Sequence, residues 1–382
     1  MEELVEFLAE RKAAHTLRVL SPLTDRAPGR ATQDERDFVD FSSNDYLGLS
    51  AHPAVVEAAQ QALTRYGVGA GASRLMSGDL EIDHQLETEL AAFKGTEAAL
   101  LFNSGYQANT GILPALVNRH DAIFADHLCH ASLLDGVQLS RAQLVRFRHN
   151  DANDLNSLLS KQRKDFKQAL IVTESIFSMD GDRAPLARLV ELKKRFQCGL
   201  YVDEAHATGV FGTHGQGCVD EDGLTDKVEF VMGTFSKALG GFGAYLAAPK
   251  LVIDYLVNTA RSFIYTTALP PAIVAADLAA LRVCREQPGL GAALLQRAAS
   301  FRQALRDHGW TARGESQIVP VIVGKSSRAV LLSQELAKRG FRVLAVRPPT
   351  VPEGQARLRF SLCAAHTDAQ LDAVLEALDE FV

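Results

Sequence analysis

The chain has 382 residues, 47% of them hydrophobic and 23% charged, which is enough to bury a large core and too long for one ordinary domain. Its 40 lysine and arginine residues against 46 aspartate and glutamate residues give a net charge of -6, so the charge favours neither nucleic acid nor an anionic membrane as a partner. No segment approaches the roughly 18 unbroken apolar residues of a membrane span, and the acidic start at Met1 to Glu3 is unlike a secretory signal. We therefore expect a cytoplasmic protein with no nucleic-acid or membrane partner.

The first forty-odd residues show no pattern that joins them to a sheet, so we expect an N-terminal arm over residues 1–45. After it, short apolar runs alternate with helical patterns, which predicts an α/β fold with a large, mainly parallel, doubly wound sheet over residues 46–272. The predicted strands are Ala98–Phe102, Ala122–Ala125, Leu144–Phe147, Ala169–Thr173, Gly199–Val202, Phe230–Met232 and Ala244–Ala247. Ligands of such sheets bind beyond the carboxyl ends of the strands, so the residues that follow each run are the first to consider for chemistry.

From residue 273 to 382 we expect a smaller α+β domain. A helical stretch reaches about His308 with a break near Pro288 and Gly289, and strands are predicted at Ile318–Val323, Val343–Val346 and Ala356–Leu362. Helices are predicted at about Arg328–Arg339 and Asp368–Phe381, the last with the capping-box spacing of Thr367 and Gln370.

The five cysteines are far apart, odd in number and without CxxC spacing. They are Cys129, Cys198, Cys218, Cys284 and Cys363. We interpret them as buried thiols and expect neither a metal site nor a disulfide.

Two segments between residues 67 and 109 are rich in glycine or helix-capping residues. Gly67–Gly71 has no complete GxGxxG pattern and no strand before it, so we interpret it as a backbone turn near a site. Asn103–Asn109 follows a predicted strand and opens a helix, where free amides bind phosphate. That signal is weak alone, because turns between strands and helices often contain glycine.

A lone histidine such as His130, at the start of the next helix, could stack over an aromatic cofactor but is more often structural.

An acidic residue ends the predicted strand Gly199–Val202: Asp203 opens the segment Asp203–His206. Burial disfavours the charge of a carboxylate unless a cation pairs with it, and a pyridinium nitrogen would supply that cation. His206 could face the same cleft. The alternative is an aspartate that caps a helix beside a structural histidine.

Lys237 ends the segment Thr234–Lys237, between a predicted strand and the glycines Gly240 and Gly241. Neighbouring hydroxyls could hold a phosphate and the glycines let a flat ligand approach, so the site suits a lysine that forms a Schiff base. For this segment alone, a solvated lysine beside a flexible turn is an equal alternative.

Taken together, these segments resemble the α-oxoamine synthases, a branch of the fold-type-I pyridoxal-phosphate enzymes. The matching segments are Asn103–Asn109, His130, Glu174–Asp182, Asp203–His206 and Thr234–Lys237. The similarity spans nearly the whole chain, from Asn44–Leu49 to Arg347–Pro352 and Arg357–Arg359. The resemblance implies a large sheet domain that binds pyridoxal 5'-phosphate, a smaller α+β domain, and a homodimer.

The resemblance also implies roles for individual residues. Lys237 would bond the cofactor and act as a base, Asp203 would pair with the pyridine nitrogen, and His130 would stack on the ring; these three are the expected catalytic residues. Further cofactor contacts are implied for Gly105, Tyr106, Ser178, His206, Thr234 and, from the neighbouring subunit, Thr266. Substrate contacts are implied for Arg18, Asn44, His130, Arg347, Thr350 and Arg359.

Two of these arginines keep alternatives. A guanidinium offers a planar fork to two carboxylate oxygens, which favours Arg359 for the amino-acid carboxylate. Arg359 could instead be a strand-edge surface arginine that alternates with Arg357, and Arg18 a solvated helix residue.

The implied activity is that of a pyridoxal-phosphate-dependent acyltransferase of biotin synthesis, which condenses L-alanine with a pimeloyl thioester and releases carbon dioxide and the thiol. The stretch Arg347–Pro352 favours this pair of small-molecule substrates over glycine with acetyl-CoA, or over the substrates of another α-oxoamine synthase. A noncatalytic subunit and a Rossmann-type oxidoreductase are the rival classes. The first should lack Lys237, and the second should carry a dinucleotide fingerprint. The acyl carrier, coenzyme A or a carrier protein, stays open.

Overall fold

The structure, a computed structural model, describes residues 1–381 and consists of two compact units. The larger unit contains residues 49–177 and 183–292. The smaller unit contains residues 1–48, 178–182 and 293–382. This division differs from the expected one in two respects, because the N-terminal segment groups with the C-terminal part, and residues 273–292 group with the large sheet.

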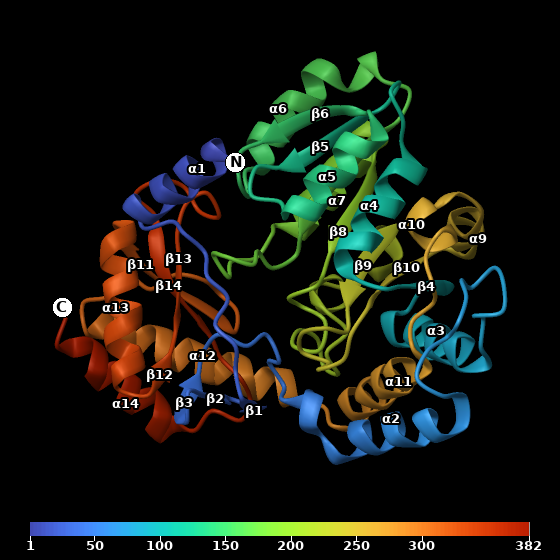
Figure 1. Cartoon of the computed structure of the whole chain (residues 1–382). Coiled ribbons are helices and arrows are strands. Elements are labelled where there is room, and N and C mark those ends of the chain that lie inside the picture. Colours follow the sequence, from blue (N-terminus) through green and yellow to red (C-terminus); the bar gives the residue numbers. More distant parts are fainter. Residues whose placement is uncertain (382) are drawn as a thin grey trace. The chain divides into compact units, whose positions relative to one another are not determined.

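A seven-stranded sheet forms the centre of the larger unit, in the order β4-β10-β9-β8-β7-β5-β6 (Figure 1). Its strands are β4 (Ala98–Phe102), β5 (Ala122–Asp126), β6 (Gln143–Phe147), β7 (Ala169–Glu174), β8 (Gly199–Asp203), β9 (Phe230–Thr234) and β10 (Ala244–Ala248). Only β10 is antiparallel to its neighbours among these strands. Each apolar run in the sequence is therefore a strand, and the predicted α/β fold with a mainly parallel sheet is confirmed.

The larger unit also contains ten helices, and several of them share a buried cluster with the sheet. The ten helices are α2 (Pro53–Tyr66), α3 (Glu81–Lys94), α4 (Gly105–Leu116), α5 (Ala131–Ser140), α6 (Ala152–Gln162), α7 (Leu186–Phe196), α8 (Cys218–Glu221), α9 (Lys250–Thr259), α10 (Arg261–Ile264) and α11 (Pro271–Glu286). Short 3-10 helices lie at Leu49–Ala51, Arg163–Asp165 and Thr225–Lys227. Leu100 and Tyr201 from the sheet, with Ile112 of α4 and Leu133 of α5, belong to one buried cluster.

Helix α11 belongs to the larger unit because its small side chains pack on α2. Ala272 and Ala275 form a buried cluster with Ala62. The helix ends before Gly289, whose φ of +91° suits glycine, and α12 (Leu290–Asp307) follows. The predicted break near Pro288 and Gly289 is thus confirmed.

The smaller unit contains two further sheets. One has the order β1-β2-β3-β12, and the other has the order β11-β14-β13. Their strands are β1 (Asp25–Ala27), β2 (Arg30–Gln33), β3 (Arg36–Asp40), β11 (Ile318–Gly324), β12 (Phe341–Arg342), β13 (Leu344–Val346) and β14 (Ala356–Ser361). Helices α1 (Glu2–Ala13), α13 (Ser326–Lys338) and α14 (Asp368–Asp379) complete the unit, and the predicted capping box of Thr367 and Gln370 is present.

The expectation that residues 1–45 join no sheet is wrong. Strands β2 and β3 form a hairpin, and β3 pairs in parallel with β12. Asp34 and Glu35, the two residues between β2 and β3, both have positive φ, as the tightest hairpin turns require. The sequence hid this hairpin because Asp34-Glu35 lacks the glycine that usually marks such a turn.

The five cysteines are free and buried. Within residues 1–381, no three or more His, Cys, Asp or Glu side chains are grouped so as to hold a metal ion. None of the helices described over this range combines the length and the apolar character that crossing a membrane requires.

Candidate active site

The carboxyl ends of three neighbouring parallel strands place polar side chains at one edge of the large sheet. Glu174 ends β7, Asp203 ends β8 and Thr234 ends β9. Glu174 and Asp203 are direct register partners, and both are buried. A buried pair of carboxyl groups is unfavourable when both are charged. Burial first, and the charge of Asp203 second, raise the pKa of Glu174 to about 8.

Lys237 lies in the turn over residues 235–243, which joins β9 directly to β10. Its Nζ atom is 3.1 Å from Nε2 of His206, so the structure brings these two predicted residues together. The turn is tightly held: Thr234 Oγ1 donates to the Gly243 carbonyl at 2.7 Å and accepts from the Ser236 amide at 3.1 Å. Gly240 has φ of +67°, and a Cβ there would lie 2.1 Å from the Ser50 amide nitrogen. Lys237 is therefore half-buried on a fixed backbone rather than solvated on a flexible turn.

Asp203 is only 5% exposed, and its two carboxylate oxygens have different partners. Oδ1 accepts from the Ala205 amide at 2.9 Å, and Oδ2 accepts from Nδ2 of Asn109 at 3.1 Å. Asp203 therefore caps a turn and not a helix. A carboxylate offers about four lone-pair sites, so these two bonds leave it able to accept from a further donor.

His130 is the N-cap residue of α5 and is held on two sides. Its backbone N–H donates to Glu174 Oε1 at 2.6 Å, and its ring Nδ1 lies 2.8 Å from Ser132 Oγ. The residue as a whole is exposed. One edge of the imidazole is thus tied into the protein while the rest of the ring is accessible.

Helix α4 begins beside this edge of the sheet with Ser104 as its N-cap. The Ser104 hydroxyl accepts from the Gln107 amide at 3.2 Å. The amides of Gly105 and Tyr106 lie in the same first turn, where N–H groups have no partner inside the helix. Asn103, just before the cap, donates to Thr266 Oγ1 at 3.3 Å. The start of α4, with Gly105 and Tyr106, therefore lies close to the segment that carries Thr266.

A buried ion pair supports the turn that carries Asp203 and His206, and no sequence pattern indicates this pair. Lys94 Nζ lies 2.5 Å from Glu204 Oε2 and also donates to the Gln216 carbonyl. The Val219 amide donates to the other Glu204 oxygen at 2.8 Å. Because both charged groups are buried and paired, the pKa of Lys94 is raised by Glu204 despite its desolvation.

Asp277 of α11 is a second buried acid that the sequence did not single out. Its Oδ1 accepts from the Phe242 amide at 3.2 Å, in the turn that carries Lys237. A Cβ on Gly241 would lie 1.8 Å from the same oxygen. Burial raises the pKa of Asp277 well above its ordinary value, and the hydrogen bond from the Phe242 amide lets Asp277 brace the turn.

In the smaller unit, Arg357 and Arg359 are both buried, on the central strand β14. Arg357 Nη1 pairs with Asp180 Oδ1 at 2.6 Å. Arg359 donates from Nε to the Ser178 carbonyl at 2.7 Å and from Nη1 to Ser361 Oγ at 2.5 Å. The alternative that Arg359 is a surface arginine at a strand edge is wrong, because β14 lies between β11 and β13.

Asn44 also belongs to this arginine group. Its Oδ1 accepts from Arg359 at 3.3 Å and from the Tyr46 hydroxyl at 3.1 Å. Within the described residues, every hydrogen bond of the Arg359 guanidinium goes to a neutral oxygen. Arg359 is thus a buried cation without an anionic partner.

The remaining predicted substrate residues meet at the end of the N-terminal segment. Arg18 Nη2 donates to Thr350 Oγ1 at 2.9 Å, and Arg347 Nη1 donates to the His15 carbonyl at 2.5 Å. Desolvation first and the nearby charge of Arg18 second lower the pKa of Arg347. The structure therefore brings two cations together around Thr350.

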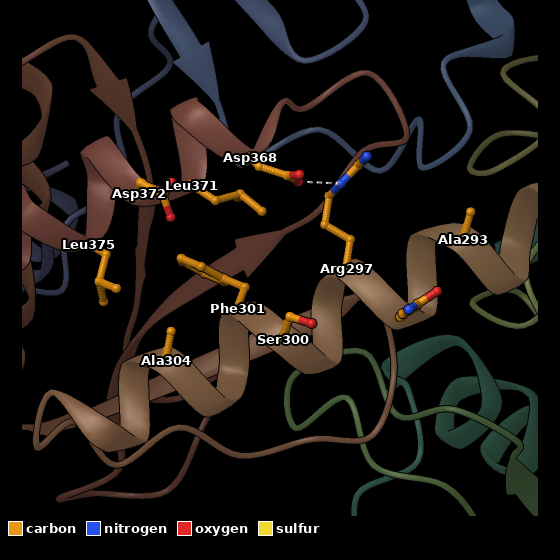
Figure 2. A pocket seen from close by; sticks show the side chains of 10 residues that line it. Ala293, Arg297, Ser300, Phe301, Ala304, Asp368, Leu371, Asp372 and Leu375 are labelled. Atoms are coloured by element: carbon orange, nitrogen blue, oxygen red, sulfur yellow. Dashed lines mark hydrogen bonds and ion pairs between the residues drawn. The ribbon is translucent and has the colours of Figure 1, made fainter.

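A separate cavity of about 440 Å³ lies between α12 and α14 in the smaller unit (Figure 2). Phe301, Leu371 and Leu375 give it an apolar wall, and Arg297 pairs with Asp368 at 3.1 Å at one side. It contains none of the predicted site residues, so we assign it no part in the chemistry.

The fold, with a lysine, an aspartate and two histidines at the carboxyl edge of a mainly parallel sheet, is that of the fold-type-I pyridoxal-phosphate enzymes, because solved enzymes of this class share it over nearly the whole chain. The sequence profile of the family "Aminotransferase class I and II" matches residues 36–378, and the chain belongs to this family. This membership excludes the alternative of a Rossmann-type oxidoreductase.

Sequence identities to individual enzymes show which branch of the family the chain resembles most among those cited. The 8-amino-7-oxononanoate synthase of Geotalea daltonii is 47% identical over 381 residues, 99% of this chain and 97% of the relative. The solved serine palmitoyltransferase of Sphingomonas wittichii is 34% identical, with a TM-score of 0.94 over 99% of this chain and 96% of that one. A serine palmitoyltransferase from S. paucimobilis that contains bound PLP is 31% identical, with a TM-score of 0.91 over the same shares. The sequence is therefore nearer to the cited 8-amino-7-oxononanoate synthase than to these two enzymes.

Proposed function

We propose that the protein catalyses the decarboxylative condensation of L-alanine with a pimeloyl thioester to 8-amino-7-oxononanoate, carbon dioxide and free thiol, a step of biotin synthesis. The observation that carries the proposal is the contact of Lys237 with His206 beside the buried carboxylate of Asp203. The 47% identity to an 8-amino-7-oxononanoate synthase supports the choice of reaction.

The residues of the larger unit fit pyridoxal 5'-phosphate as the cofactor. Asp203 keeps acceptor capacity for the protonated pyridine nitrogen, and the first-turn amides of α4 at Gly105 and Tyr106 are suited to a phosphate. Lys237 supplies the amine that holds the cofactor covalently, and His130 supplies an accessible ring to lie against it. Ser178, Thr234 and Thr266 stay predicted cofactor contacts. The Thr234 hydroxyl also braces the lysine turn.

When bound, pyridoxal phosphate withdraws electrons from the Cα atom of an attached amino acid and so makes its proton acidic. Lys237 would take that proton at Nζ and later return it, which requires a neutral amine. Asp203 would keep the pyridine nitrogen protonated through its charge, and His206 would orient Nζ of Lys237. The overall reaction forms a bond between alanine Cα and the thioester carbonyl carbon, expels the thiolate, and releases the alanine carboxylate as carbon dioxide.

Arg359 is the proposed ligand of the alanine carboxylate, because it is a buried cation whose partners are all neutral. Asn44 would hold its guanidinium plane. Arg18 and Arg347, with Thr350, are proposed to bind the distal carboxylate of the pimeloyl chain. We expect Arg18→Ala to raise KM for pimeloyl-CoA about tenfold, the value of one charge-assisted hydrogen bond, and to leave KM for acetyl-CoA unchanged. Equal effects on both thioesters would remove Arg18 from this role.

A substrate matrix tests the proposal directly. Purified protein with pyridoxal phosphate is assayed with alanine, glycine or serine against pimeloyl-, acetyl-, succinyl- or palmitoyl-CoA, and thiol release and product mass are measured. We expect the highest kcat/KM for alanine with pimeloyl-CoA. An optimum for glycine with acetyl-CoA would assign the chain to another branch of the α-oxoamine synthases and leave the cofactor site unchanged. Pimeloyl carrier protein in the same assay decides between the two carriers.

We also propose a homodimer in the cytoplasm. Large apolar side chains are exposed on two segments that the Ala268 amide joins to the Ala72 carbonyl at 2.9 Å: Val68 is 82% exposed, Met76 78% and Tyr265 72%. Burial of such a surface against a second copy would stabilise a dimer. Light scattering of the purified protein tests this, and a monomer that is fully active would contradict it.

A further inference from the structure

A buried hydrogen-bond network connects Asp203 to His130, two residues that come from different strands and helices. Asn109 of α4 donates from Nδ2 to Asp203 Oδ2 at 3.1 Å and to Ser132 Oγ at 2.9 Å. Ser132 Oγ lies 2.8 Å from His130 Nδ1. Asn109 and Ser132 are each 1% exposed, so water does not compete for these bonds.

The partners of Asn109 fix the orientation of its amide. Tyr201 donates its hydroxyl hydrogen to Asn109 Oδ1 at 2.7 Å. A carboxylate such as Asp203 only accepts, so the amide nitrogen must face it. Both hydrogens of Nδ2 are then used, one on Asp203 and one on Ser132. Since Ser132 Oγ accepts from Asn109, its own hydrogen is available for His130 Nδ1.

A second donor also points at the same ring nitrogen. The Ser132 backbone N–H donates to His130 Nδ1 at 3.3 Å, so that the imidazole caps α5. A proton on Nδ1 would face the Ser132 N–H and lose that bond, and it would require the Ser132 hydroxyl to turn its own hydrogen away and accept instead. It would also place a positive charge at the positive end of the helix dipole. The geometry therefore leaves Nδ1 as an acceptor.

We propose that Asn109 and Ser132 are positioning residues that hold His130 as a neutral ring with its proton on Nε2, and that they tie this ring to the carboxylate of Asp203. The inference concerns hydrogen bonds within this chain. It rests on the proposed function in one respect only, namely that the His130 ring lies against the cofactor. One amide thus sets both the partner of the pyridine nitrogen and the ring that lies against the cofactor.

The charges around His130 act in both directions, and their balance agrees with a neutral ring. Partial burial and the charge of Lys237 lower the pKa of His130, whereas Asp203 from β8 and Asp135 from α5 raise it, and the balance is a lowered pKa. Glu174 from β7 accepts the backbone N–H of His130 and holds its own proton near neutral pH. His130 therefore offers a hydrogen-bond donor at Nε2 and is not a base at Nδ1.

Nuclear magnetic resonance of the cofactor-loaded protein with 15N-labelled histidine tests the ring state, because the nitrogen shifts distinguish the two tautomers and the imidazolium. His130→Asn identifies the His130 signals by their loss. We expect the Nε2–H tautomer from about pH 5.5 to about pH 8, the range in which an ordinary histidine changes charge. A proton on Nδ1, or an imidazolium at neutral pH, would overturn the proposal, and the wild-type spectrum is sufficient to show either.

Ser132→Ala tests the network, with Ser140→Ala as the matched control. Ser140 is also buried on α5, and its hydroxyl donates to the Val137 carbonyl at 2.6 Å, away from His130. Loss of the bond to Nδ1 should raise the His130 pKa by roughly one half to one unit and admit the other tautomer. Ser140→Ala should leave both unchanged, and Ser132→Thr should restore the wild-type ring. Equal behaviour of Ser132→Ala and Ser140→Ala contradicts the role of Ser132.

The ring state of His130 and the condensation activity are measured separately, so this inference and the proposed function can fail independently. A protein with the Nε2–H ring that does not condense alanine with any acyl thioester would refute the proposed function and leave the inference intact. Condensation of alanine by a protein whose His130 is an imidazolium would do the reverse.

Discussion

The strand ends of the larger unit and the arginines of the smaller unit are both polar and buried, but they balance their charges differently. In the turn that carries Asp203, the buried charges of Lys94 and Glu204 pair with each other. Around Arg359, the cation is held only by neutral oxygens. Removing a charge from water is costly unless a partner compensates it. The ion pair of the first region therefore holds its own turn in place, whereas the charge of Arg359 has only neutral partners within the described residues.

Arg357, two residues before Arg359 on the same strand, shows that this difference is not a general property of buried arginines. Arg357 is paired with Asp180 and is 2% exposed. Two arginines that point to the same side of β14 thus differ: Arg357 is held in an ion pair, and Arg359 is the one proposed to bind a ligand. The comparison predicts that substitutions in the two regions change different quantities: rate and stability in the larger unit, and substrate KM at Arg359.

The largest effect is expected for Lys237→Ala, which removes the amine at the centre of the larger unit. Loss of a positioned base costs about a hundredfold to ten thousandfold in rate, and loss of the covalent attachment adds to it. We expect no measurable condensation, weak binding of pyridoxal phosphate, and loss of the visible absorption band that borohydride abolishes in the wild type. Lys227→Ala, an exposed lysine of the same unit, is the control. Substantial turnover by the Lys237 variant would exclude this lysine from the chemistry.

Arg359→Lys should weaken alanine binding without unfolding the protein. A lysine keeps the positive charge but not the planar fork, so we expect KM for alanine to rise about tenfold to a hundredfold while the melting temperature changes little. Arg357→Met is the comparison variant. It leaves Asp180 unpaired, and we expect it to lower the free energy of unfolding by about 3 kcal/mol with KM for alanine near the wild-type value. If Arg359→Lys lowered stability and Arg357→Met raised KM for alanine, the distinction between the two arginines would be refuted.

Lys94→Met breaks the ion pair behind the Asp203 turn and leaves the charge of Glu204 buried. Breaking such a pair costs about 3 to 5 kcal/mol, measurable by chemical denaturation, and the displaced turn should weaken cofactor binding as well. The control is Lys250→Met, because Lys250 and Asp254 form an exposed pair on α9, whose loss should hardly change stability. If both variants were equally stable, the buried pair would not position the turn.

The effect expected from Glu174→Gln depends on pH. The ordinary pKa of this carboxyl is 4.5, and in the folded protein it is raised to about 8. Between these values the folded state holds a proton that the unfolded state has lost, so stability falls as the pH rises through this window. The variant should lose less stability between about pH 5 and about pH 8 when cofactor-free protein is denatured chemically. Glu57→Gln, at an exposed position, should follow the wild type.

The sequence predicted the large sheet well because its strands are apolar throughout. Ala122–Asp126 and Ala169–Glu174 are buried at every residue, which parallel strands covered on both faces require. Asp203 was recognisable for the same reason, since it follows directly on an apolar run, and Lys237 was recognisable because it lies between such a run and Gly240. The N-terminal hairpin was missed because β2 and β3 are mostly polar and part-exposed.

Residues whose roles depend on distant contacts could not be predicted. Lys94 and Glu204 are 110 residues apart in sequence, and nothing near Lys94 distinguishes it from a surface lysine of α3. Asp277 lies in a helix rich in alanine and leucine, where one acid is unremarkable. Asn109 lay inside a segment selected for phosphate binding. Its bonds to Asp203 and Ser132 appear only when α4, α5 and β8 are assembled.

Strand β10 has a consequence for the order in which the site can form. It is the last strand of the large sheet to be synthesised, yet it lies between β4 and β9 and pairs with both. Until β10 enters, β4 has no hydrogen-bonded neighbour in the sheet. The turn with Lys237 precedes β10 directly, so the insertion that docks the lysine also attaches the segment with Ser104 and Gly105. A nascent chain that stops before residue 244 would hold Lys237, Ser104 and Gly105 without the strand that joins their segments in one sheet.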